Sequence, residues 1–141
     1  MSDIGVKRVD HVSMAVWSID QQAAFLERVF GVKRLSGGVS EAQEYRWETF
    51  AIPNSTLQFE LIEPTSEDSF VAKFLRERGP GIHHVTIEVE DIERAADALR
   101  TNGIEPFPNV HYDGWRQTFI HPKDSGGVLF QLFTAAPAPP E

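Results

Sequence analysis

The chain has 141 residues, a length that favours one domain with a sizeable core. Thirteen basic and twenty-one acidic residues give a formal net charge of −8, which argues against nucleic acid or an anionic membrane surface as a partner. Because there is no cysteine, disulfides and thiolate metal sites are excluded, and a metal would need His, carboxylate or amide ligands. No apolar run reaches the ~20 residues of a membrane span, and the N-terminus does not resemble a signal peptide. A cytoplasmic location is therefore expected.

The first half of the chain predicts a strand, a helix and three further strands. Apolar residues alternate over 9–17, which is typical of a strand, and Ser18 with Gln21 forms a capping-box pattern. The helix that follows has its apolar residues on one stripe and is expected to end at Gly31. The later strands are expected at 32–36, 43–52 and 56–63, with turns at Gly37-Gly38 and Pro53-Asn54.

The second half repeats this order of elements. Residues 82–90 predict a strand, Asp91 is a good N-cap, and Gly103 is expected to end the second helix. Residues 66–79 between the halves predict a connecting helix. The remaining strands are expected at 104–108, 115–121 and 127–133, so each half reads β-α-β-β-β.

Four polar positions recur in these two halves on otherwise apolar strands. His11 and His84 occupy matching places 73 residues apart, and Glu60 and Gln131 match at an offset of 71. Side chains on one face of a strand recur every second residue, so each position points away from its apolar neighbours. Two explanations remain open on these grounds: the four residues bind a divalent metal ion, or they are hydrogen-bonded structural residues.

Several longer motifs resemble the vicinal oxygen chelate superfamily (glyoxalase, bleomycin resistance and dioxygenase proteins), and most closely its methylmalonyl-CoA epimerase branch. The motifs are DHVSMAV at 10–16, FELIEP at 59–64, HHV at 83–85 and FIHPKDSGGVLFQL at 119–132. The resemblance implies an α+β fold in which two tandem βαβββ modules form a cupped, partly closed mixed sheet with a metal site inside. One domain would then fill residues 1–141, with module 1 at about 7–64, a connector helix at 65–80, module 2 at about 81–134 and a disordered tail at 135–141.

Carried over by position, the superfamily's metal ligands fall on His11, Glu60, His84 and Gln131. The cofactor implied is a divalent ion such as Co, Mn, Ni, Zn or Fe. His83, beside His84, points to the other face of the strand and is expected to be structural. In the epimerase pattern the amide often stands in the first half and the carboxylate on the last strand. In this chain the two are exchanged.

The resemblance further implies an isomerase. It would be a metal-dependent epimerase or racemase that abstracts the α-proton of a 2-substituted malonyl-CoA-type thioester through a metal-stabilised enolate. The family's base is a Glu on the third strand of the first half, which favours Glu48, then Glu44, with Glu88 as an outside candidate. The expected partners are an acyl-CoA thioester and a second copy of the chain in a homodimer, with no nucleic acid and no membrane.

Three alternatives share the fold: a glyoxalase I-type lactoylglutathione lyase, an Fe(II) dioxygenase and a non-catalytic ligand-binding protein. Gln131 argues against the lyase, because an amide cannot take the proton that a Glu takes there in glyoxalases. It also argues against the dioxygenase, because a fourth protein ligand would fill a position that oxygen chemistry needs open. Retention of all four ligand positions argues against the binding protein.

Overall fold

The computed structural model describes residues 3–112 and 115–135. Contacts between α-carbons divide the chain into two compact units. We call His11–His83 the N-terminal unit, and Met1–Asp10 together with His84–Glu141 the C-terminal unit. Among the described residues, no helix is both long and apolar enough to span a membrane.

Two strands contribute residues to both units. β1 (Val6–Ala15) begins in the C-terminal unit and continues into the N-terminal unit, and β5 (Gly81–Val89) runs from the N-terminal unit into the C-terminal one. The unit boundaries therefore cut two strands that the sequence predicts as the first strand of each half.

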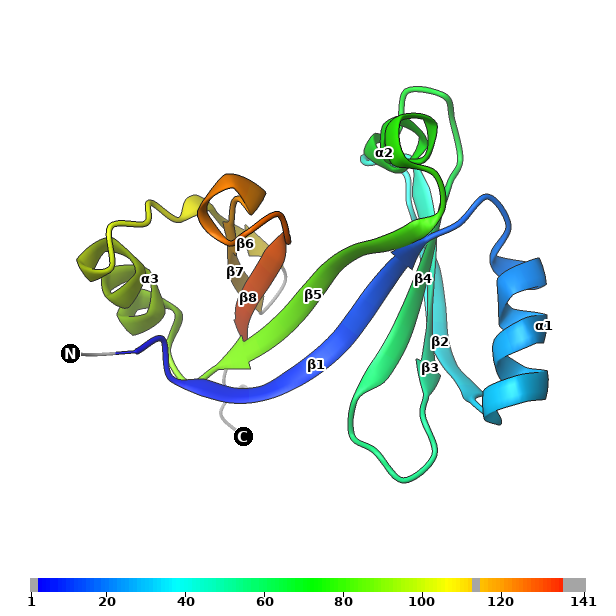
Figure 1. Ribbon diagram of the computed structural model, residues 1–141, viewed down its shortest axis with the longest axis horizontal. Helices are drawn as coiled ribbons and strands as arrows, with labels where there is room; N and C mark the ends of the chain where they lie inside the picture. Colours follow the sequence, from blue (N-terminus) through cyan, green and yellow to red (C-terminus); the bar gives the residue numbers. More distant parts are fainter. Residues whose placement is uncertain (1–2, 113–114, 136–141) are drawn as a thin grey trace, which may run out of the picture. The chain divides into compact units, whose positions relative to one another are not determined.

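The N-terminal unit is a mixed sheet with two helices. Its strands lie in the order β2-β3-β4-β1, with β1 parallel to β4 and the other pairs antiparallel. In Figure 1, α1 runs along one side of β2, β3 and β4. Besides β1, its elements are α1 (Ile19–Phe30), β2 (Lys33–Ser40), β3 (Tyr45–Ala51), β4 (Gln58–Pro64) and α2 (Phe70–Arg78).

Helix α1 begins and ends where the sequence predicts. The Ser18 side chain accepts a hydrogen bond from the backbone N–H of Gln21, and so satisfies a donor that has no partner inside the helix. Gly31 ends the helix in the left-handed region at φ 69°, which glycine adopts without steric cost. The buried stripe is Ile19, Ala23 and Leu26.

The two faces of the N-terminal sheet pack against different helices. Met14, Phe50 and Leu61 lie on the face whose core includes residues of α1. Ala15 and Ile62 lie on the other face, where Val71 and Leu75 of α2 cover them together with Trp47. His11, Ser13 and Glu60 have the parity of this second face, because side chains alternate along each strand.

The predicted turn at Gly37-Gly38 is wrong, because both glycines lie inside β2. They pair with Glu48 and Trp47 of β3, and the chain turns later, over residues 41–44. A Cβ atom built at Gly38 would lie 3.1 Å from the Trp47 ring. Because the glycines have no side chain, the Trp47 ring can pack closely against them across the strand pair. The turn at Pro53-Asn54 is confirmed.

The C-terminal unit repeats the same topology, with the strand order β5-β8-β7-β6 and β5 parallel to β8. Asp91 caps its helix by accepting from two backbone N–H groups, and Val89, Ile92, Leu99 and Leu132 form its core. The tail expected at 135–141 lies outside the described residues, apart from Ala135, which ends β8. The elements after β5 are α3 (Ile92–Thr101), β6 (Phe107–Tyr112), β7 (Trp115–Ile120), a 3₁₀ turn (Pro122–Asp124) and β8 (Phe130–Ala135).

The strand register confirms the predicted repeat. Ser13 pairs with Glu60 in the parallel β1–β4 pair, and Thr86 pairs with Gln131 in the parallel β5–β8 pair. Each histidine stands two residues before the hydroxyl residue of its pair. The two βαβββ modules therefore place the same four-residue pattern at the same register.

Candidate metal centre

His11 and Glu60 come together inside the N-terminal unit. His11 lies on β1 and is 8% exposed, and its Nε2 lies 3.6 Å from Oε1 of Glu60 on β4. The parallel register brings them close, because Glu60 pairs with Ser13 and so stands one step along the same face from His11. An imidazole and a carboxylate in this arrangement offer a nitrogen and an oxygen ligand.

His84 is the third potential metal ligand among the described residues, together with His11 and Glu60. It is half-buried and lies on β5, where the C-terminal unit begins after His83. The three side chains offer two nitrogen ligands and one oxygen ligand, which are donor types that a divalent ion takes from a protein.

His83 has a different environment from His84. Its ring centroid lies 5.4 Å from that of Phe70 and 4.9 Å from that of Phe74, both on α2. Burial, and to a smaller extent the nearby Arg78 charge, lower the pKa of His83 to about 4. A neutral imidazole packed among aromatic rings agrees with the expectation that His83 is structural.

Gln131 is held by hydrogen bonds at both ends of its amide. Its Oε1 accepts from the Thr86 hydroxyl at 2.8 Å, and its Nε2 donates to Oε1 of Gln117 on β7. Thr86 is fully buried and Gln117 nearly so. Sequence reasoning missed Gln117, because its counterpart in the other module is Trp47 and so gives no polar repeat.

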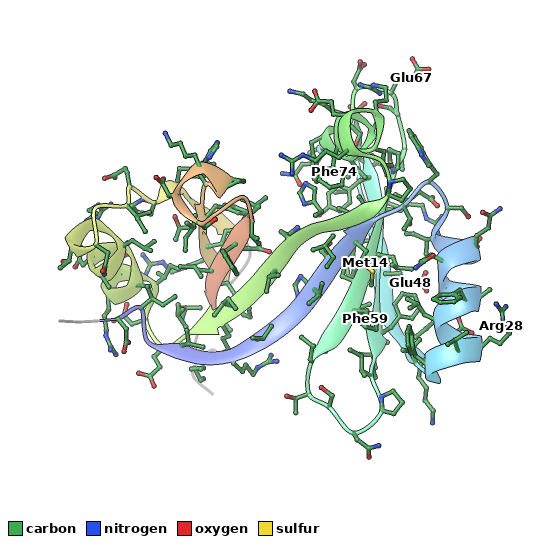
Figure 2. The ribbon with its side chains drawn as sticks, viewed as in Figure 1. Met14, Arg28, Glu48, Phe59, Glu67 and Phe74 are labelled. Atoms are coloured by element: carbon green, nitrogen blue, oxygen red, sulfur yellow. The ribbon has the colours of Figure 1, made fainter. Side chains whose placement is uncertain are left out.

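Glu48, the first candidate base, lies on the face of β3 opposite to that of Glu60. It pairs with Leu61, whereas Glu60 pairs with its neighbour Thr49, so Glu48 and Glu60 point to opposite sides. Figure 2 shows Glu48 with Met14 and Phe59 on the α1 side of the sheet. The signal was available in the sequence, because Phe50 shares the parity of Glu48 and is a core residue.

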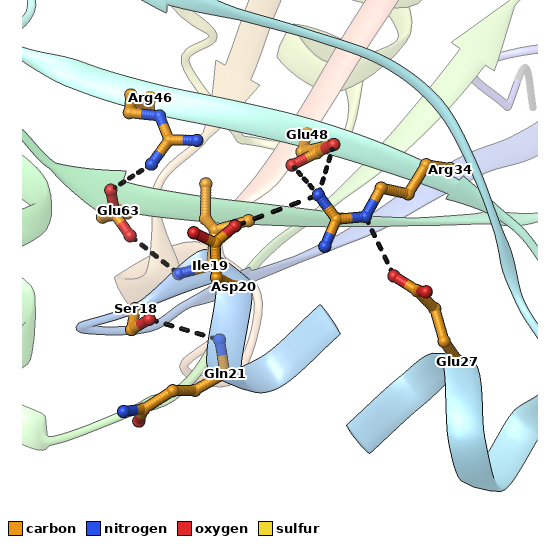
Figure 3. A network of polar contacts seen from close by, with 9 residues as sticks. All are labelled: Ser18, Ile19, Asp20, Gln21, Glu27, Arg34, Arg46, Glu48 and Glu63. Atoms are coloured by element: carbon orange, nitrogen blue, oxygen red, sulfur yellow. Dashed lines mark hydrogen bonds and ion pairs between the residues drawn. The ribbon is translucent and has the colours of Figure 1, made fainter. Parts of the chain in front are cut away.

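Glu48 belongs instead to a network of ion pairs around Arg34. Arg34 Nη1 lies 3.1 Å from Glu48 Oε1, and Arg34 Nε lies 2.9 Å from Glu27 Oε1 on α1. The hydrogen bond with Glu27 raises the pKa of Arg34, and the Glu48 charge raises it as well. Figure 3 shows this network beside a second one, in which Glu63 accepts from Arg46 and from the backbone N–H of Ile19. These carboxylates tie α1 to the sheet.

The other two candidate bases also have clear positions. Glu44 lies outside β3, at the end of the preceding turn, with φ 58°. Its backbone oxygen accepts from the N–H of Thr65, and among the described residues its half-buried carboxylate has no ion pair. Glu88, by contrast, is bound by Arg8 at 2.9 Å and Lys7 at 3.5 Å. Of the three candidate bases, Glu44 is therefore the one whose carboxylate forms no ion pair with a described residue.

The donor set fits a divalent metal ion. Two imidazoles and a carboxylate suit Zn, Co, Ni, Mn or Fe. The Gln131 amide oxygen could add a fourth donor, which carries no charge. One carboxylate against a doubly charged ion would leave a net charge of +1. The buried Ser13 hydroxyl beside Glu60 has no hydrogen-bond partner among the described residues, as expected if Glu60 changes its contacts when a ligand binds.

Two βαβββ modules with His11, Glu60 and His84 as potential metal ligands define a protein of the vicinal oxygen chelate type. Residues 10–119 match the profile of the glyoxalase/bleomycin resistance protein/dioxygenase superfamily, and the chain belongs to this superfamily.

Individual relatives are methylmalonyl-CoA epimerases. The mitochondrial enzyme of Homo sapiens is 33% identical over 132 residues, which cover 89% of this chain and 72% of that protein. The crystal structure of methylmalonyl-CoA epimerase from Mycobacterium tuberculosis has a TM-score of 0.84 and 33% identity, covering 97% of this chain and 93% of that one. The Streptomyces coelicolor methylmalonyl-CoA epimerase in complex with 2-nitronate-propionyl-CoA has a TM-score of 0.82 and 31% identity, covering 94% and 100%.

Proposed function

We propose that this chain is a metal-dependent epimerase that moves the α-proton of a 2-substituted malonyl-CoA thioester. The observation that carries the proposal is the pair of His11 and Glu60 in the N-terminal unit, where Nε2 lies 3.6 Å from Oε1, together with the matching register of Thr86 and Gln131 in the C-terminal unit. The epimerase names of relatives that are about a third identical to the chain support the reaction class and the acyl-CoA substrate.

His11, Glu60, His84 and Gln131 would hold the ion in this proposal. When bound, a divalent ion supplies positive charge for the oxygen on which negative charge develops as the α-proton leaves. The protein supplies one negative ligand and three neutral ones. Since three of the four ligands carry no charge, the site keeps an excess of positive charge with which to bind an anionic substrate.

Glu44 is the carboxylate that we propose for proton transfer. It lies in the turn immediately before β3, next to Tyr45, which packs with the core residues on the α2 face of the sheet. Since Glu48 is committed to Arg34 on the other face, Glu44 is the better candidate of the two. A general base must reach the substrate proton directly or through one water molecule.

Gln131 disfavours the lyase alternative. A glyoxalase-type reaction uses a carboxylate at this position for proton transfer, and an amide has no basic lone pair to offer. The fixed hydrogen bonds of Gln131 also give it a defined orientation, which suits a ligand more than a proton carrier.

Metal analysis followed by proton exchange tests the proposal. Purified protein loaded with Co²⁺ is incubated with methylmalonyl-CoA in deuterated water, and α-deuteron incorporation is followed by NMR. We expect stoichiometric metal and rapid exchange, with none after chelation. If metal binds but the α-proton does not exchange, the epimerase assignment is wrong. If no divalent ion binds, the metal-dependent mechanism is wrong as well.

A further inference from the structure

We propose that Gln117 and Thr86 are positioning residues that hold the Gln131 amide so that its oxygen is presented to the metal ion. This inference rests on the proposed function, because it assigns a role to residues around one of the proposed ligands. All three residues lie in the C-terminal unit, on β7, β5 and β8.

The contacts define one orientation of the amide. The Thr86 hydroxyl donates to Gln131 Oε1 at 2.8 Å, and Gln131 Nε2 donates to Gln117 Oε1. Thr86 has no exposed surface and Gln117 is 9% exposed. Hydrogen bonds are stronger away from water, and leaving a buried polar group unpaired is costly. The amide is therefore held at both ends by groups that have little access to solvent.

A metal ligand needs this orientation because the two ends of an amide are chemically different. The oxygen has two lone pairs, so it can accept from Thr86 and still offer the second pair to a cation. The NH₂ group has only donors, so it repels a cation. A flipped amide would turn this group towards Thr86 and bring the Gln131 oxygen against that of Gln117. The two hydrogen bonds together oppose that flip.

The N-terminal unit lacks this arrangement and does not need it. Its ligand at the equivalent position is Glu60, whose two carboxylate oxygens are interchangeable. The residue equivalent to Gln117 is Trp47, which packs in the core beneath α2. The position of Gln117 and Trp47 therefore holds a hydrogen-bond acceptor in the module with the amide ligand. In the module with the carboxylate ligand it holds an apolar ring.

Metal affinity measures the effect directly. Co²⁺ is titrated by calorimetry into the apo protein and into Gln117→Leu and Thr86→Val, each of which removes one hydrogen bond while keeping the side-chain size. Residues that orient metal ligands typically contribute about 10–100-fold in affinity, and we expect a loss in this range for both variants. Gln117→Glu and Thr86→Ser keep the acceptor and the donor, and should restore most of the affinity.

Thr118→Val is the matched control on the same strand. Thr118 is fully buried, points to the other face of β7, and its hydroxyl has no partner among the described residues. Its replacement should leave Co²⁺ affinity unchanged. Thermal unfolding of each apo variant is measured beforehand, and Thr86→Val carries the test if Gln117→Leu does not fold.

A second ligand background separates orientation from general damage. In Gln131→Glu the ligand is symmetric, so adding Gln117→Leu should cost little further affinity. Equal losses in both backgrounds would overturn the inference, as would wild-type affinity in Gln117→Leu and Thr86→Val. Either result leaves the proposed function intact provided that the wild-type protein binds Co²⁺. If the wild-type protein does not bind it, the proposed function fails first.

Discussion

The two units present the same backbone register but different polar residues at the proposed ligand positions. In the N-terminal unit Ser13 pairs with the charged Glu60, and the Ser13 hydroxyl has no hydrogen-bond partner among the described residues. In the C-terminal unit Thr86 pairs with the neutral Gln131, whose amide is hydrogen-bonded at both ends. The repeat thus preserves the position of the polar residue, while the residues around it differ between the modules.

The comparison extends to the third strand of each module. Trp47 and Gln117 are equivalent in register, as are Glu48 and Thr118, because the partners Ile62 and Phe133, and Leu61 and Leu132, match between modules. The N-terminal unit uses these positions for packing and for ion pairs with α1. The C-terminal unit uses one of them, Gln117, to hydrogen-bond the Gln131 amide. The following predictions test this division of roles.

The largest expected effect concerns Glu44, which we assign to the N-terminal unit's part in proton transfer. Glu44→Gln removes the basic carboxylate and keeps its shape, so α-proton exchange should fall about 10²–10⁴-fold, the usual contribution of a general base. Exchange of the α-proton of methylmalonyl-CoA in deuterated water, followed by NMR, gives the rate.

Glu48→Gln is the matched control for that experiment. It changes a nearby carboxylate on β3 that faces α1, and exchange should stay within a few-fold of the wild type. The opposite pattern, with a slow Glu48→Gln and an active Glu44→Gln, would contradict our assignment of the two faces.

The next effect concerns the stability of the N-terminal unit, in which the His83 imidazole packs against α2. The pKa of His83 is about 4 in the folded protein against an ordinary 6.5, so between these pH values the unfolded chain binds a proton that the native state does not. The free energy of unfolding should therefore fall by about 2–3 kcal/mol between pH 7 and pH 4.5 on account of this residue.

Urea unfolding of wild type and His83→Phe at both pH values measures that contribution. The phenyl ring keeps the contacts with Phe70 and Phe74 but cannot be protonated. The variant should lose less stability than the wild type as the pH falls. An identical loss in the two proteins would show that His83 is not held neutral by burial.

A smaller effect on stability is expected at Trp47, the residue of the N-terminal unit that is equivalent to Gln117. Gly38→Ala puts a Cβ atom 3.1 Å from the Trp47 ring, and overpacking of this kind typically costs about 1–3 kcal/mol. Gly81→Ala, where a Cβ atom meets nothing within 4 Å, is the control. Chemical unfolding of both variants should show a clear loss for Gly38→Ala only.

The smallest effects concern the equivalent pair Glu48 and Thr118. Glu48→Gln weakens a partly exposed ion pair with Arg34, which should cost about 0.5–1 kcal/mol in the free energy of unfolding and less at high salt. Thr118→Val replaces by a methyl group a buried hydroxyl that has no partner in the described part of the chain, so stability should stay the same or rise slightly. A large loss for Thr118→Val would mean that its hydroxyl has a role.

The repeat was predictable because it depends on local pattern. Alternation along each strand fixes which residues share a face, and the capping residues Ser18 and Asp91 mark where both helices begin. From these the two βαβββ modules follow, together with the position of His11 beside Glu60.

The errors arose where sequence pattern does not report on contacts across strands. Gly37-Gly38 has the composition of a turn, but its small size serves the approach of Trp47, which lies ten residues along the chain from Gly37. Glu48 lies on the face of β3 that α1 covers, and its shared parity with Phe50 in the sequence already indicated this face. Gln117 could not be found by repetition, because its equivalent is apolar.

Metal affinity of the two histidine variants tests the central claim most directly. Co²⁺ is titrated into wild type, His11→Ala and His84→Ala, with His121→Ala, an exposed histidine on the 3₁₀ turn, as the control. The account predicts one equivalent of Co²⁺ for wild type and His121→Ala. It also predicts a loss of about 100-fold or more for each of the other two, since removing a ligand costs at least as much as disturbing the residues around it. Wild-type affinity in His11→Ala or His84→Ala would contradict it.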